Sequence, residues 1–240
     1  MKILMFSLTF IFAIAPIFAE QLPNHMLWDA LLKKHVKKNG VDYDGFKKDK
    51  KELDDYLKQF EAISLTDFND KEQLALFINA YNGFTIQLIL QHYSSNLKSI
   101  KDIKNPWNNK IYNIAGVKYS LDEIEHKFLR EKLKEPRIHF AINCASVSCP
   151  PLQPFAFLPD KIEEQLTEVT GKFINSSEGV KFLNNEIAIS QLFDWFKKDF
   201  ETDKTTVKDY IARYLKPSKD ISKFKVSFIS YNWNLNKDEN

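Results

Sequence analysis

Cysteine is scarce in this sequence, and long apolar runs are scarcer. Only Cys144 and Cys149 occur among the 240 residues, so thiol chemistry or a disulfide can arise only there. No His-x-x-His, His-x-x-x-His or Cys-x-x-Cys spacing is present, and these are common spacings of metal ligands. We therefore expect no metal and no cofactor. Beyond the first 17 residues, no run approaches the roughly 20 apolar residues of a membrane-spanning helix.

An excess of one sign of charge is also lacking. The chain has 34 basic and 32 acidic residues, and removal of Lys2 with the leader described below leaves 33 against 32. A surface for nucleic acid or anionic membranes needs clustered excess positive charge. We therefore expect no nucleic-acid partner.

The amino-terminal residues have the order of a secretion signal. Lys2 is basic, residues 3–17 are almost unbroken apolar sequence, and Ala19 is a small residue followed by polar Glu20. This order predicts a signal peptide over residues 1–19, a periplasmic or secreted location, and no membrane span after cleavage. The remaining residues 20–240 contain no repeat and no Gly/Ser-rich linker, which predicts one domain.

Helical and strand patterns alternate without a βαβ rhythm. Apolar spacing predicts helices, one of which, Lys71 to His92, is apolar on nearly all sides and should be buried. Ser120 and Glu123 form a capping box for another helix, ending near Leu133. The hairpins and strands are expected at residues 111–119, 138–143, 180–189 and 226–229. The fold class is therefore α+β, with helices packed on a small, mostly antiparallel sheet.

Several separated segments resemble one known family. They are LALFINAYNGFTI (74–86), SLDEIEHKFLR (120–130) and RIHFAINCASVSCPPL (137–152), with weaker matches at 189–200 and 231–236. In this order they resemble the bacterial exported members of the domain of unknown function 547 family. The family has no assigned activity, so the resemblance implies none.

A remoter resemblance is to papain-like and transglutaminase-like proteins. There a buried helix carries a Cys nucleophile, the next strand a His, and a later strand an Asp or Asn. His139 in the segment 138–143 is similar to that His. The buried helix here holds no Cys, however, and has Asn79 and Asn82 instead, whose amides cannot serve as the nucleophile.

The two cysteines leave three interpretations open: a small disulfide ring, a nucleophile with a neighbouring base, or buried free thiols. In a regular strand His139 and Cys144 point to opposite faces, which disfavours a direct pair. His126 beside one of the thiols, or His139 reaching Cys149, are the open arrangements for a thiol and its base.

Glu125, His126 and Arg130 share one predicted helix and have two interpretations. The carboxylate can orient the imidazole as a general base, or all three can form an exposed ion-pair ladder. Asn79 and Asn82 are likewise either a hydrogen-bonded core network or a binding wall, because a buried amide needs partners.

Two functional hypotheses follow. The first is a thiol- or histidine-dependent hydrolase or acyl-transfer enzyme acting on peptide or cell-envelope amide bonds. Its candidate catalytic residues are His139, Cys144, Cys149, Glu125 and His126, and its candidate binding residues are Asn79, Asn82 and Arg130. The alternative is a catalytically inert binding module, periplasmic, with a structural disulfide.

Overall fold

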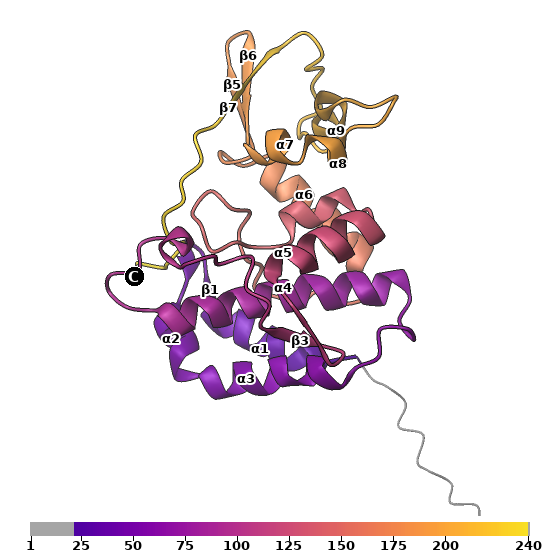
Figure 1. The fold of residues 1–240 in the computed structure, drawn as a ribbon. Coiled ribbons are helices and arrows are strands. Elements are labelled where there is room, and N and C mark those ends of the chain that lie inside the picture. Colours follow the sequence, from indigo (N-terminus) through magenta and orange to yellow (C-terminus); the bar gives the residue numbers. More distant parts are fainter. Residues whose placement is uncertain (1–21, 240) are drawn as a thin grey trace, which may run out of the picture.

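The computed structural model describes residues 22–239, so the predicted signal peptide at residues 1–19 lies outside the described residues. Helices form the lower and middle parts of the molecule in Figure 1, and the upper part combines a small sheet with short helices. Within residues 22–239, no helix is both long enough and apolar enough to cross a membrane.

The amino-terminal helices form an aromatic core. They are α1 (His25–His35), α2 (Tyr43–Lys48) and α3 (Lys50–Lys58), followed by the 3-10 helix η1 (Gln59–Ala62). Trp28, Tyr56 and Phe60 are fully buried among them. Strands β1 (Val36–Lys37) and β2 (Gly40–Val41) form a short antiparallel pair between α1 and α2.

Helix α4 (Asp70–His92) crosses the molecule above α1 and α3 and below α5 (Figure 1). A capping box of Asn69 and Glu72 starts it, satisfying backbone N–H groups that have no partner within the helix. Seventeen of its residues are buried, which confirms the prediction of a helix enclosed on nearly all sides.

The segment after α4 contains the hairpin and the capping box that the sequence predicts. The 3-10 helix η2 (Ile100–Asp102) precedes strands β3 (Tyr112–Ile114) and β4 (Val117–Tyr119). Ser120 and Glu123 then cap α5 (Leu121–Glu123). The helix continues as η3 (Ile124–Lys132), a π-helix where an α-helix was expected, and π-helical turns are frequent at functional sites.

The predicted strand at residues 138–143 is absent, and this prediction was wrong. The chain instead forms the 3-10 helix η4 (Pro136–Phe140), with Pro136 at its start. The Asn82 side chain then donates to the Ala141 carbonyl and accepts from the Asn143 N–H. These backbone groups are thus satisfied by an amide side chain of α4, and no neighbouring strand is needed.

The upper part begins with α6 (Ile162–Ile174), which packs against η4. Strands β5 (Val180–Leu183) and β6 (Glu186–Ile189) pair antiparallel, and β6 pairs in parallel with β7 (Lys225–Phe228). The short helices are α7 (Leu192–Trp195), α8 (Lys197–Phe200) and α9 (Val207–Ala212). The α+β class is confirmed, although the strands of residues 22–239 form three small sheets where one was expected.

The carboxyl-terminal segment runs from β7 back to the lower part, along one side of the molecule (Figure 1). Val147 and Ser148 N–H groups donate to the carbonyls of Asn234 and Asn232, and Val41 N–H donates to the Asn236 carbonyl. Backbone hydrogen bonds therefore hold this segment against the loop that carries the two cysteines.

Candidate functional site

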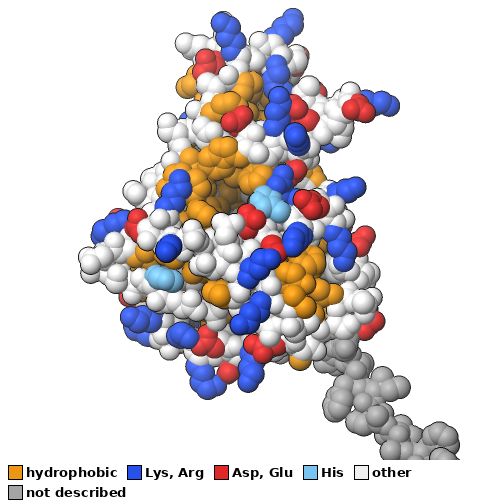
Figure 2. Space-filling view, in the orientation of Figure 1, with side chains coloured by type: hydrophobic (Ala, Val, Ile, Leu, Met, Phe, Trp, Pro, Cys, Tyr) orange, Lys and Arg blue, Asp and Glu red, His pale blue; other side chains and the backbone are white. Residues whose placement is uncertain are grey.

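A cavity of about 240 Å³ lies between the helical middle part and the upper part. Figure 2 shows a hollow lined by hydrophobic side chains in this region. All five predicted catalytic residues line the cavity: Glu125, His126, His139, Cys144 and Cys149. They come from η3, η4 and the loop after η4, so the fold brings together side chains that the sequence left apart.

The predicted binding residues Asn79 and Asn82 do not line the cavity. Asn79 donates to the Phe157 carbonyl at 2.7 Å and accepts from the Phe157 N–H at 3.0 Å. Asn82 makes the equivalent pair of bonds to Ala141 and Asn143. Both amides are buried and hold loops to α4, which favours the core-network interpretation over the binding wall.

One side of the cavity, here named the thiol wall, is lined by Cys144, Cys149 and Tyr231. The wall also includes Ser146, which does not line the cavity but contacts Cys144 and Tyr231. The two sulfurs are free thiols 3.0 Å apart, well beyond the roughly 2.05 Å of a disulfide bond, which contradicts the disulfide among the three interpretations of this pair. The Cys144 N–H also donates to the Cys149 sulfur at 3.0 Å. Cys144 is partly exposed, whereas Cys149 is buried.

Hydrogen bonds favour a negative charge on Cys144. Hydrogen bonds from Cys149, Ser146 and Tyr231 to its sulfur lower its pKa to about 6, against the opposing effect of burial. The Ser146 and Tyr231 hydroxyls lie 3.1 and 3.4 Å from that sulfur. Burial instead raises the pKa of Cys149. At neutral pH Cys144 is therefore the thiolate of the pair, and the thiolate is the nucleophilic form.

The backbone beside Cys144 is strained. Ala145 has a φ of 62°, in the left-handed region that residues with a Cβ rarely adopt. Asn143 stabilises this turn, because its side-chain oxygen accepts the Ala145 N–H at 2.9 Å. Backbone strain of this kind concentrates at functional sites, where the surrounding structure maintains it.

The opposite side, here named the carboxylate wall, is lined by Glu125 and His139. Asp199 and Arg130 do not line the cavity but belong to the same wall, because Asp199 binds both His139 and Arg130. His139 is buried, and its Nε2 lies 2.7 Å from Asp199 Oδ2. Arg130 binds both Asp199 oxygens, with Nε–Oδ2 at 2.6 Å and Nη2–Oδ1 at 3.0 Å. Burial favours protonation of Asp199, but hydrogen bonds from His139 and Arg130 outweigh it and lower the pKa of Asp199.

This pairing sets the protonation of His139. An ionised Asp199 can only accept, so Nε2 of His139 carries a hydrogen. Burial lowers the pKa of His139, despite the opposing effect of Asp199, and this favours the neutral ring. Its Nδ1 is then a free acceptor, and it lies 3.9 Å from Glu125 Oε1.

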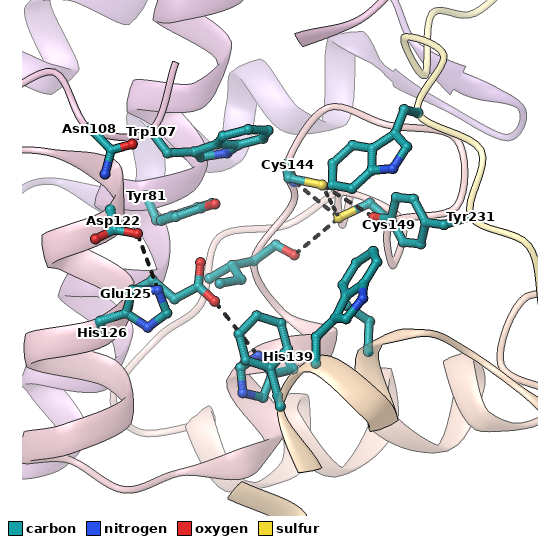
Figure 3. Close-up of a pocket in the computed structure, with 15 residues that line it drawn as sticks. Tyr81, Trp107, Asn108, Asp122, Glu125, His126, His139, Cys144, Cys149 and Tyr231 are labelled. Carbon is teal, nitrogen blue, oxygen red and sulfur yellow. Dashed lines mark hydrogen bonds and ion pairs between the residues drawn. The ribbon is translucent and has the colours of Figure 1, made fainter. Parts of the chain in front are cut away.

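Glu125 is held in its protonated form at neutral pH. Burial, followed by the negative charge of Cys144, raises the pKa of Glu125 to about 8. Its side chain is only 13% exposed, which contradicts the alternative of an exposed ion-pair ladder. Figure 3 shows Glu125 on one side of the cavity and the two sulfurs with Tyr231 on the other.

His126 and Arg130 support the carboxylate wall from the rim. His126 Nε2 lies 3.2 Å from Asp122 Oδ1, and its Nδ1 contacts the Arg130 guanidinium. Arg130 does not line the cavity, so the structure places this predicted binding residue behind Asp199 as an ion-pair partner.

The predicted pairing of a thiol with His126 or His139 is not formed. Among the described residues, the hydrogen bonds to the two sulfurs come from Cys, Ser and Tyr side chains and from backbone, and none comes from a His. His139 is turned toward Asp199 because η4 replaces the expected strand. The Glu125 carboxyl group, which also lines the cavity, is then the candidate acid and base opposite the thiols.

Sequence reasoning missed Asp199 and Tyr231 as site residues. Asp199 is 60 positions from His139, and Tyr231 is 87 from Cys144. Both fall within or at the edge of the two weaker segments of resemblance, 189–200 and 231–236, and this was the only available signal. Within residues 22–239, no cluster of three or more His, Cys, Asp or Glu side chains has the geometry to hold a metal ion.

Comparison with known proteins is informative for one part of the chain. No curated protein and no solved structure matches it, so the resemblance to papain-like and transglutaminase-like proteins stays a prediction. Residues 65–174 match the model of a family described as "Protein of unknown function, DUF547". This central segment carries Glu125, His139, Cys144 and Cys149, and its match supports the placement of the chain in the DUF547 family.

Proposed function

We propose that this protein is a thiol-dependent hydrolase or acyl-transfer enzyme, with Cys144 as nucleophile and Glu125 as general acid and base. The observation that carries the proposal is one cavity lined by a thiol with a lowered pKa and a carboxyl group with a raised pKa. Titratable groups whose environments move their pKa values apart mark the acid and base assignments of an active site.

In the first step, the Cys144 thiolate attacks a carbonyl carbon and forms a carbon–sulfur bond. The bond from that carbon to the leaving nitrogen breaks, and the nitrogen takes the proton of the Glu125 carboxyl group. Because Cys144 is already ionised at neutral pH, no histidine is needed to deprotonate it. Glu125, protonated below a pKa of about 8, has the proton that an amine leaving group requires.

In the second step, water or another acceptor attacks the thioester. The Glu125 carboxylate removes the proton of the attacking group, the carbon–sulfur bond breaks, and the Cys144 thiolate leaves. Both starting forms are regenerated. His139 Nδ1, which lies 3.9 Å from Glu125, is a positioning group and a second acceptor for this proton.

The substrate class follows from the expected location. The signal-like order of residues 1–19 supports export, and peptide or cell-envelope amide bonds are the amides available there. The amino-terminal order and the open cavity thus support an exported enzyme acting on such bonds.

Alkylation with iodoacetamide at about pH 7 tests the nucleophile. Cys144→Ser should abolish modification of the folded protein, because Cys149 is buried with a raised pKa. Cys149→Ser should still be modified, at Cys144. If the folded protein is not alkylated at Cys144 faster than a free peptide thiol, the proposal is wrong and an inert binding module remains.

A pair of matched substrates tests Glu125. A p-nitrophenyl ester expels a stable anion, whereas a p-nitroanilide needs its leaving nitrogen protonated. Glu125→Gln should slow anilide turnover by about 10²- to 10⁴-fold and slow acyl transfer from the ester less. Glu131→Gln on the same π-helix is the matched control, because Glu131 is exposed. Equal losses with both substrates would contradict the general-acid assignment.

A further inference from the structure

Tryptophan is concentrated at the cavity. Three of the four tryptophans, Trp107, Trp195 and Trp233, line it. The fourth, Trp28, is fully buried in the amino-terminal core. Three distant parts of the chain therefore contribute their largest aromatic side chain to one surface.

The three rings form a continuous aromatic surface with Tyr231. Trp233 is at its centre, with ring centroids 5.7 Å from Trp195 and nearly parallel planes, 6.0 Å from Trp107, and 4.5 Å from Tyr231. Trp195 is nevertheless 45% exposed. Exposed aromatic faces gathered in a recess are typical of a ligand-binding surface.

The charges of the residues that line the cavity are unfavourable for an anion. No Lys or Arg is among the described residues lining the cavity, whereas Asp122 and the Cys144 thiolate are. Glu125 also lines the cavity but is protonated and therefore uncharged at neutral pH. Two cations contact rings of the lining. Lys101 Nζ lies 3.6 Å from the Trp233 ring centroid, and Arg130 lies over Phe196 but is bound to Asp199.

From these two observations we propose that the site accepts acyl donors whose acyl part carries an uncharged aromatic ring and rejects those carrying a carboxylate. The ring stacks on the surface of Trp195 and Trp233 while the carbonyl carbon reaches Cys144. This inference rests on the proposed function, because it assigns substrate preference to the same thiol. Offset stacking of aromatic rings adds attraction beyond the area buried.

Alkylation rates of Cys144 measure this preference without knowledge of the natural substrate. The probes are iodoacetamide, iodoacetate and N-benzyl iodoacetamide, and each rate is divided by the rate of the same reagent with glutathione. On this scale we expect the benzyl reagent to exceed iodoacetamide by about three- to tenfold. Iodoacetate should be slower than iodoacetamide by about tenfold, because the cavity already holds negative charge.

Variants locate the preference. Trp195→Ala should lower the rate with the benzyl reagent more than the rate with iodoacetamide. Phe182→Ala is the matched control, because Phe182 is 42% exposed on β5 and does not line the cavity. Trp195→Phe retains an aromatic face and should retain most of the preference for the benzyl reagent. If both Trp195→Ala and Trp195→Phe lose reactivity with all reagents, misfolding explains the loss.

The possible failures are distinct. If Cys144 reacts rapidly but the three normalised rates are equal, the preference is wrong and the thiol enzyme stands. If the normalised rate with iodoacetate exceeds that with iodoacetamide, a cation at the cavity binds the carboxylate and the inference is wrong. If Cys144 reacts with none of the reagents, the proposed function fails with it.

Discussion

The thiol wall and the carboxylate wall belong to one cavity, yet they act on a negative charge in opposite ways. On the thiol wall, hydrogen bonds to the sulfur favour the Cys144 anion and lower its pKa to about 6. On the carboxylate wall, burial disfavours the Glu125 anion and raises its pKa to about 8. The strong donors of that wall are committed to Asp199, so Glu125 has none to compensate for its burial.

For Cys144 and Glu125, the number of hydrogen-bond donors affects the pKa more than the burial of the side chain does. Cys144 and Glu125 both face the same cavity, and Cys144 has three side-chain groups near its sulfur. Glu125 has only His139, at 3.9 Å, as a polar partner among the interactions of the described residues. Removal of a donor to Cys144 should therefore raise the pKa of the thiol, whereas removal of the Glu125 acid should change how stability depends on pH.

The largest effect is expected from Asp199→Asn, which removes the charge that holds His139 and Arg130. We expect a loss of about 2 to 4 kcal/mol in the free energy of unfolding, because Arg130 loses its bidentate partner. Both ends of the ion pair are about one-fifth exposed, which places the loss below that of a fully buried pair. Urea unfolding at pH 7 measures it.

Asp194→Asn is the control for this prediction. Asp194 is exposed on the neighbouring helix α7, and its substitution should change stability by less than about 0.5 kcal/mol. Similar losses for the two variants would mean that the carboxylate wall does not depend on its ion pair.

Glu125→Gln should change the dependence of stability on pH. Above the ordinary Glu pKa near 4.5 the unfolded chain ionises, while folded Glu125 stays protonated up to about pH 8. Glu125 therefore lowers the stability of the wild type as pH rises through this window, and Glu125→Gln removes this contribution. The difference in the free energy of unfolding between Glu125→Gln and the wild type should grow by about 1 to 3 kcal/mol between pH 5 and pH 8. One group can contribute at most about 1.36 kcal/mol for each of these pH units.

Unfolding midpoints of both proteins across this pH range decide the matter. Glu131 is exposed on the same helix, and the unfolding midpoints of Glu131→Gln should change with pH as those of the wild type do. A pH-independent difference between Glu125→Gln and the wild type would show that Glu125 ionises normally in the folded protein.

The smallest effect is expected from Tyr231→Phe, which removes one donor from the thiol wall. The hydroxyl lies 3.4 Å from the Cys144 sulfur, a long contact. The midpoint of the iodoacetamide rate against pH should rise from about 6 by about half a unit, equivalent to about 0.7 kcal/mol. Tyr93→Phe, whose hydroxyl bonds Asp44 outside the cavity, should not move it. An unchanged midpoint for Tyr231→Phe would remove Tyr231 from the thiol wall.

Local signals in the sequence were sufficient for most helices and hairpins. The box of Ser120 and Glu123 caps its helix as predicted, because a cap depends on residues within one turn. The hairpins at Tyr112–Tyr119 and Val180–Ile189 depend on adjacent strands and were also predictable. The conformation of residues 138–143 could not be predicted locally. The Asn82 side chain, 59 and 61 positions away, satisfies the backbone groups of Ala141 and Asn143 there.

Periodicity and residue type are enough to predict the α+β class, the buried helix α4 and the candidates Glu125, His126, His139, Cys144 and Cys149. The roles of these candidates depend on contacts in the folded protein. The tertiary structure paired His139 with Asp199, left Glu125 without strong donors, and brought Tyr231 to Cys144. The reason is that a pKa depends on neighbours in space, and the decisive neighbours here are about 60 to 90 positions apart in the chain.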